Sequence, residues 1–136
     1  MASVHLQSSS GYVQQIQARS HQFRADEPLD NGGTDSGPAP YELLLGGLAA
    51  CTSLTLRMYA DRKQWELGLI DVRLRFSRDE QGVEKIDRTI AFGAELSEAQ
   101  IARLAEICEK TPVTKTIRQG TPIATVLQRV ALDAAS

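Results

Sequence analysis

The chain has 136 residues, of which 15 are Lys or Arg and 17 are Asp or Glu, so its formal net charge is −2. This length fits one domain with a core of its own, and we expect residues 1–136 to form that single domain. The charges are spread along the chain. Because no cationic block could neutralise a phosphate backbone, nucleic acid is not an expected partner.

The N-terminus shows no targeting signal. Residues 1–15 lack the basic start and apolar centre of a signal peptide, and no run approaches the roughly 18 apolar residues that span a bilayer. We therefore expect a cytoplasmic protein that does not associate with a membrane. In that compartment Cys51 and Cys108 would be free thiols or a transient redox pair.

A bound metal or other cofactor is not expected. The histidines are His5 and His21 only, and together with the two cysteines their spacing matches no zinc motif.

The N-terminal part of the chain is predicted to be extended. Polar and apolar residues alternate around Val4 and Leu6, a serine-rich turn follows, and residues 12–23 fit further strands, two or three in all. From Asp26 to Pro40 the chain is dense in Asp, Asn, Gly and Pro, which favours a long loop. Long loops inside compact domains are often functional.

A long helix is predicted from Pro40 to about Lys63. Proline suits the first turn of a helix, and residues 43–51 carry no charge, which indicates a helix buried on all sides. Gly46 and Gly47 each cost about 1 kcal/mol relative to alanine inside a helix. We therefore expect another element to pack closely on the stripe of small residues at i, i+3, i+4 and i+7, namely Gly47, Ala50, Cys51 and Leu54.

The second half of the chain begins with a predicted hairpin. Apolar residues alternate with polar ones around Leu74 and again around Ile90, and residues 79–82 have the composition of a tight turn.

Two further helices and a strand are predicted after the hairpin. Ser97 and Gln100 form a capping box before an amphipathic segment that places Cys108 on its apolar face. Thr111 then reads as the N-cap of a short helix whose first residue is proline. A final strand is expected over residues 122–130, and the whole order indicates an α+β fold.

Two segments resemble the OsmC/Ohr family of bacterial thiol-dependent hydroperoxide reductases. They are GPAPYELLLGGLAAC, from Gly37 to Cys51, and TPVTKTI, which begins at Thr111. The best fit is to the OsmC-related branch, in which ADEP and GGTDSGP precede the long helix. The resemblance implies an OsmC-like fold with antiparallel sheets around a long buried central helix, and an intertwined homodimer.

The resemblance also implies the chemistry of the site. Cys51 matches the attacking cysteine on the long helix, which an arginine and a glutamate help to organise. A thiol in apolar surroundings ionises poorly unless a cation lies nearby, so an arginine from the N-terminal strands makes physical sense. Of the two candidates, Arg19 and Arg24, we favour Arg24, because it adjoins the loop that leads to the helix.

The chain departs from the family pattern at two positions. Tyr41 occupies the place of the glutamate, and Glu42 follows it; nine residues separate Glu42 from Cys51, which is roughly 13 Å along a helix axis. Glu42 would therefore act across the dimer or after a shift. The resolving cysteine before Pro-Val is replaced by Thr111, and Cys108, one turn earlier, either substitutes for it or simply fills the core.

The leading hypothesis is reduction of organic hydroperoxides, with resolution of oxidised Cys51 by Cys108 or by an external dithiol. An apolar surround favours organic or fatty-acid hydroperoxides over hydrogen peroxide; its expected residues are Tyr41, Leu44, Leu48, Leu54, Ile107 and Thr111. The competing hypothesis is a dimeric protein that binds a small hydrophobic molecule without turning it over.

Overall fold

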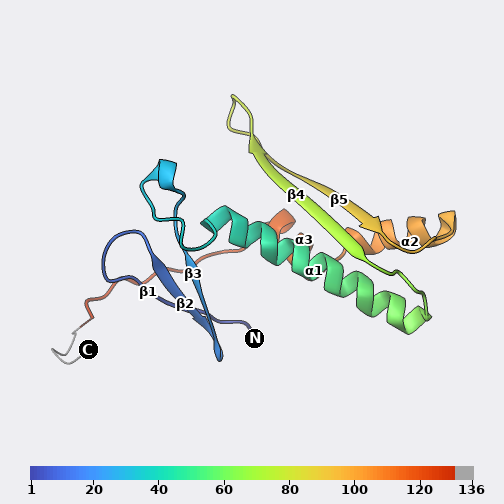
Figure 1. Ribbon diagram of the computed structural model, residues 1–136, viewed down its shortest axis with the longest axis horizontal. Helices are drawn as coiled ribbons and strands as arrows, with labels where there is room; N and C mark the ends of the chain where they lie inside the picture. The colour runs from blue at the N-terminus through green and yellow to red at the C-terminus, as the bar shows by residue number, and fades with distance from the viewer. Residues whose placement is uncertain (131–136) are drawn as a thin grey trace.

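The computed structural model describes residues 1–130 and has an α+β architecture, as the sequence predicted (Figure 1). The strands are β1 (His5–Gln7), β2 (Gln14–Ala18), β3 (His21–Ala25), β4 (Ile70–Arg78) and β5 (Glu84–Phe92). The helices are α1 (Pro40–Lys63), α2 (Glu98–Cys108) and α3 (Pro112–Gln119), with a short 3-10 turn, η1, at Leu29–Asn31.

The strands form two separate antiparallel sheets. One has the order β1–β2–β3 and lies beyond the start of α1, and the other is the β4–β5 hairpin, which packs against α1 (Figure 1). In the hairpin Val72 pairs with Ile90 and Phe76 pairs with Ile86. Because side chains alternate between the two faces of a strand, this register turns one apolar face of the hairpin toward α1.

The core lies where the second half of α1 meets α2 and the hairpin. Its buried members are Leu56, Ala60, Leu67, Leu104 and Cys108. Cys108 therefore points inward, as predicted. The capping box that begins α2 is also confirmed, since Ser97 Oγ accepts the Gln100 N–H at 3.1 Å and Gln100 Oε1 accepts the Ser97 N–H at 2.9 Å.

Helix α1 is covered on one side only, which differs from the all-round burial predicted. Its buried residues are Leu48, Thr52, Leu56 and Ala60, four residues apart along one stripe. On another face Leu54 and Met58 are 57% and 55% exposed. A Cβ added at Gly46 or Gly47 would meet no atom within 4 Å. Gly46, Gly47 and Ala50 are exposed, whereas Cys51, in the same predicted stripe, is contacted by Val113 at the start of α3.

By length and composition α1 could cross a membrane, contrary to the expectation from the sequence. An 18-residue window of this helix has a mean hydropathy of 1.3. Core helices of soluble proteins meet the same criterion. Since β4, α2 and α3 all pack on α1, we interpret it as a core helix.

The strand predicted over residues 122–130 is wrong for this chain. Residues 120–130 form neither helix nor strand, and Ile123, Val126 and Leu127 are more than 80% exposed. A strand needs a partner edge for its backbone groups, and within residues 1–130 no edge pairs with this segment.

The loop between β3 and α1 is organised by the buried carboxylate of Asp26. One oxygen accepts the Glu27 N–H, and the other accepts the N–H and hydroxyl groups of Thr34 and Ser36. Gly33 is also required, because a Cβ there would lie 2.0 Å from the Glu27 carbonyl oxygen. These contacts fix the point at which the chain enters α1.

We expect Asp26→Asn to lower the melting temperature at pH 7. The hydrogen bonds from Thr34 and Ser36 hold the pKa of Asp26 well below its usual range. A lowered pKa stabilises the fold at pH values above that of the unfolded carboxyl, about 4, and this stabilisation is lost as the pH falls further. Thermal unfolding followed by circular dichroism should show a gap between wild type and variant that narrows below about pH 4.

The matched control is Asp35→Asn, an exposed carboxylate in the same loop. It should leave the melting temperature nearly unchanged. Equal effects of the two variants at pH 7 would contradict the structural role of Asp26.

Candidate functional site

Cys51 lies at the point where α1 meets the beginning of α3. The thiol is half-buried, and its Sγ accepts the backbone N–H of Val113 at 3.5 Å. The hydroxyl of Thr55, one turn further along α1, lies 4.0 Å from the same sulfur. A residue in the middle of one helix is thereby placed at the N-terminus of another.

This contact arises from the way α3 begins. Thr111 is the N-cap and Pro112 the first helical residue, but the Thr111 side chain makes no capping hydrogen bond. The first N–H groups of a helix have no partner inside it. One of them, the N–H of Val113, donates to the sulfur of Cys51. The N-terminus of a helix carries partial positive charge, and the sulfur of Cys51 lies against it.

Arg88 is the residue that sequence reasoning missed. It lies on β5 opposite Leu74, and its side chain is only 13% exposed. Its Nη1 donates to the hydroxyls of Thr52 and Thr114, each at 2.9 Å, and its Nη2 donates to the carbonyl oxygen of Cys108 at 3.1 Å. A signal was present in the sequence, because Arg88 interrupts the row of inward-facing apolar residues on β5.

Thr111, for which the resemblance implied the place of a resolving cysteine, is fully buried. Its hydroxyl lies 2.5 Å from that of Thr114, which also accepts from Arg88. The position is therefore occupied by a hydroxyl network that ends on a guanidinium, and it has no thiol to form a disulfide with Cys51.

Cys108 and Cys51 are both free thiols, but their surroundings differ. Cys108 is only 7% exposed. Burial raises the pKa of the Cys108 thiol, and the positive charge of Arg88 offsets this only in part. Cys108 is therefore held as a neutral thiol near neutral pH.

Glu42 and Arg24 are not brought to Cys51 within this chain. Glu42 is exposed and accepts the Ala39 N–H at 2.8 Å, which caps the start of α1. Arg24 is exposed on β3. The hydrogen bonds and ion pairs among residues 1–130 include none from the Arg24 side chain to the cysteine.

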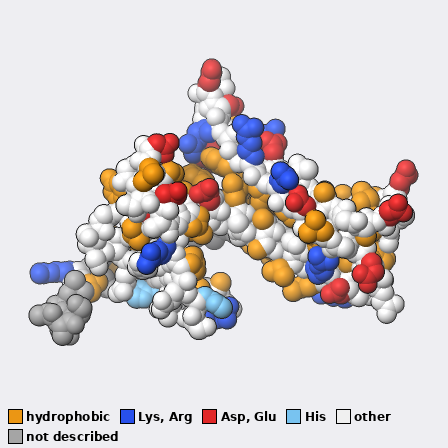
Figure 2. Space-filling view, viewed as in Figure 1, with side chains coloured by type: hydrophobic (Ala, Val, Ile, Leu, Met, Phe, Trp, Pro, Cys, Tyr) orange, Lys and Arg blue, Asp and Glu red, His pale blue; other side chains and the backbone are white. Residues whose placement is uncertain are grey.

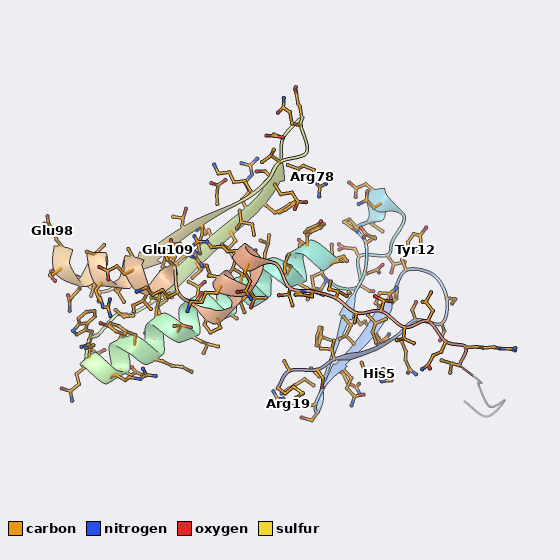
Figure 3. All side chains as sticks on the ribbon, turned by 180° about the vertical axis from the view of Figure 1, so that it is seen from behind. His5, Tyr12, Arg19, Arg78, Glu98 and Glu109 are labelled. Carbon is orange, nitrogen blue, oxygen red and sulfur yellow. The ribbon has the colours of Figure 1, made fainter. Side chains whose placement is uncertain are left out.

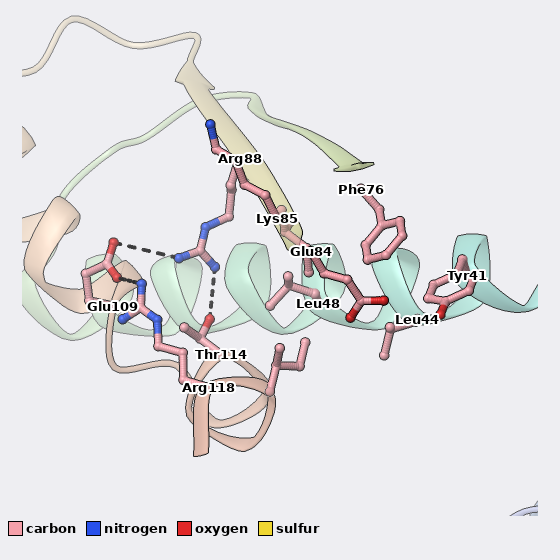
Figure 4. Close-up of a pocket in the computed structure, with 12 residues that line it drawn as sticks. Tyr41, Leu44, Leu48, Phe76, Glu84, Lys85, Arg88, Glu109, Thr114 and Arg118 are labelled. Atoms are coloured by element: carbon pink, nitrogen blue, oxygen red, sulfur yellow. Dashed lines mark hydrogen bonds and ion pairs between the residues drawn. The ribbon is translucent and has the colours of Figure 1, made fainter. Parts of the chain in front are cut away.

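A cavity of about 540 Å³ opens between the first half of α1, the hairpin and α3 (Figure 4). Leu44, Leu48 and Ile117 contribute to its apolar wall, and Tyr41 stacks on Phe76 with ring centroids 4.6 Å apart. Of the six residues expected to form a substrate pocket, Tyr41, Leu44 and Leu48 line this cavity. The other three do not: Leu54 is exposed on α1, Ile107 packs against the core and Thr111 is buried.

The inner end of the cavity is charged. Glu109 follows the end of α2 (Figure 3), and its carboxylate pairs with Arg118 and, at 4.0 Å, with Arg88 (Figure 4). Cys51 is not among the lining residues, although Leu48 and Thr114, which flank its contact with Val113, both are. Residues 1–130 hold no group of three or more His, Cys, Asp or Glu side chains placed to bind a metal ion.

The two thiols should differ in reactivity in the folded protein. With iodoacetamide at pH 7.5, we expect Cys51 to be alkylated at least about tenfold faster than Cys108, because only the Cys51 sulfur is half-exposed and placed at a helix N-terminus. Peptide mass spectrometry at successive times measures the two rates. The difference should vanish in guanidinium chloride, and equal rates in the folded protein would contradict the assignment.

The comparisons with known proteins agree with this fold. The family model for OsmC-like proteins matches residues 33–126. The structure is similar to that of an OsmC-like protein from Mycoplasma pneumoniae, with a TM-score of 0.69, 19% identity and coverage of 87% of both chains. It is also similar to the organic hydroperoxide resistance protein OhrB of Bacillus subtilis, with a TM-score of 0.60, 24% identity and coverage of 87% of this chain and 90% of that one.

No curated protein sequence matches the chain significantly. At the identities given, the structural similarities concern the fold alone. The family match covers more than half of the chain, and with the OsmC fold this establishes that the protein belongs to the OsmC-like family, within OsmC/Ohr.

Proposed function

We propose that this protein reduces organic hydroperoxides in oxidative-stress defence, with Cys51 as the attacking thiol. The observation that carries the proposal is the contact between Cys51 Sγ and the Val113 N–H at the start of α3. The Cys51 thiolate attacks the terminal peroxide oxygen, and the O–O bond breaks. The sulfur becomes a sulfenic acid and the alkoxide leaves as an alcohol after it takes up a proton.

The substrate class is supported by the cavity between the first half of α1, the hairpin and α3. Its apolar wall includes Tyr41, Leu44, Leu48 and Ile117. Such a wall can contact the alkyl part of an organic hydroperoxide, which hydrogen peroxide lacks. The names of the Bacillus subtilis relative and of an OsmC protein from Legionella pneumophila refer to organic hydroperoxide resistance, which agrees with this proposal.

An external dithiol, rather than Cys108, is the proposed reductant of the sulfenic acid. Cys108 is buried and its carbonyl is bound by Arg88. Burial also raises the pKa of the Cys108 thiol, which leaves little thiolate to attack a sulfenic acid.

Peroxide consumption with a dithiol reductant tests this function. We expect wild type to consume cumene hydroperoxide catalytically and Cys51→Ser to lose on the order of 10²-fold or more in rate. Cys108→Ser should retain most of the activity, because the external dithiol resolves Cys51. Loss of peroxide is followed with a ferrous xylenol orange assay.

Two outcomes would overturn parts of the proposal. Equal consumption by wild type and Cys51→Ser would exclude the peroxidase function. A Cys51–Cys108 disulfide found by mass spectrometry after stoichiometric peroxide would exclude resolution by the external dithiol alone.

We further propose that the functional protein is a homodimer in the cytoplasm. Each chain of this dimer folds as one domain. Gly46, Gly47 and Ala50 on α1 are exposed, as are the side chains of Leu54 and Met58, which leaves a surface on this helix without cover. Figure 2 shows hydrophobic side chains exposed around the long helix. A second copy of the chain would bury this surface. In such a dimer we propose that Arg24 and Glu42 of one copy act at Cys51 of the other.

Ala50→Glu should disrupt this dimer, because it places a charge in the small-residue stripe of α1. We expect the molar mass from light scattering after gel filtration to fall to that of one chain, while the matched variant Ala102→Glu, at an exposed position on α2, stays dimeric. Wild type that elutes as a monomer at micromolar concentration would contradict the proposal.

A second candidate function is non-catalytic binding of a small hydrophobic molecule. It is favoured by one observation, namely that Cys51 does not line the cavity of about 540 Å³. The peroxide assay separates the two, since a binding protein would consume no more peroxide than Cys51→Ser does.

A further inference from the structure

Arg88 joins three helices at one point. Its guanidinium donates to Thr52 on α1, to Thr114 on α3 and to the last carbonyl of α2, at Cys108. Few side chains can do this, because the guanidinium presents five N–H donors in a fixed plane. A lysine at this position would carry the same charge on a single nitrogen and could not direct donors from two nitrogens in one plane.

The two threonines directly follow the residues that make the sulfur contact. Thr52 follows Cys51 on α1, and Thr114 follows Val113, whose N–H reaches the sulfur. The same nitrogen, Nη1 of Arg88, holds both threonine hydroxyls at 2.9 Å. By binding both threonines, Arg88 holds the N-terminus of α3 at a fixed distance from Cys51.

Arg88 also belongs to a charged cluster at the inner end of the cavity. The titratable groups that face it are Glu109, which follows α2 and whose carboxylate lies 4.0 Å from the guanidinium, Arg118 of α3, which pairs with the same carboxylate, and the buried thiol of Cys108 on α2. From β5 itself, Glu84 and Lys85 also line the cavity and are exposed, so solvent screens them. Two arginines share the carboxylate of Glu109, so the inner end of the cavity carries net positive charge, which favours an anion nearby.

We propose that Arg88 is a positioning residue for the Cys51 thiolate, because it holds the N-terminus of α3 against the sulfur and adds positive charge behind it. This role deepens the proposed peroxidase function and rests on Cys51 as its reactive group. The sequence predicted that the arginine acting on Cys51 comes from the N-terminal strands, whereas this proposal assigns such a role to an arginine on β5.

The test is the pH dependence of Cys51 alkylation, measured by iodoacetamide and peptide mass spectrometry. In Arg88→Met we expect the midpoint of the rate profile to move up by about one pH unit, which slows alkylation about tenfold at pH 7. Arg88→Lys keeps the charge and should move it by less. Glu109→Gln removes the counter-charge and should move the midpoint down.

The opposite signs of Arg88→Met and Glu109→Gln separate electrostatic positioning from simple loss of structure. Circular dichroism confirms folding of each variant, and Glu109→Gln tests the proposal even if Arg88→Met does not fold. Profiles that coincide with wild type in both variants, or shifts of the same sign, would overturn it. Arg78→Met, an exposed arginine on β4 (Figure 3), is the control and should leave the profile unchanged.

Alkylation needs no peroxide, so this inference and the peroxidase function can fail separately. A protein that consumes no hydroperoxide but shows the opposite shifts retains the Arg88 role. A protein that consumes hydroperoxide through Cys51 with an unchanged profile in both variants loses it.

Discussion

The largely buried guanidinium of Arg88 constrains how the helices of this protein meet. A buried donor left without a partner costs about 1–3 kcal/mol, and more when it is charged. Arg88 therefore needs acceptors from several directions, and it finds them on α1, α2 and α3. Satisfying one side chain fixes the position of three helices, and the environment of Cys51 follows from that arrangement.

Cys51 lies where α1 meets α3, and residues that do not touch the sulfur hold these two helices together. Cys51 contacts α3 through a backbone N–H, and its position depends on threonines that Arg88 binds. Thr111 takes part in the same hydroxyl network. Its hydroxyl, bound to that of Thr114, helps to hold the start of α3.

The single chain leaves its central helix half covered. Leu48, Thr52, Leu56 and Ala60 are buried by the hairpin, α2 and α3, whereas the face with Gly47 and Ala50 is open. The exposed segment from 120 to 130 is similar, because its apolar side chains meet no strand edge. Both features expose groups that favour a partner: the open face of α1 leaves apolar surface in water, and segment 120–130 leaves apolar side chains and unpaired backbone groups there.

The sequence by itself determined the local elements and one chemical group. Proline at position 40, the capping box at Ser97 and the alternation around Leu74 predicted α1, α2 and the hairpin, because these signals act over a few residues. The motifs around Cys51 indicated the family, which the match over residues 33–126 establishes. What only the tertiary structure decided was which groups surround that sulfur. Periodicity relates neighbours along one element, and the contacts from Val113 and Arg88 join residues far apart in the chain, so no local pattern could place them.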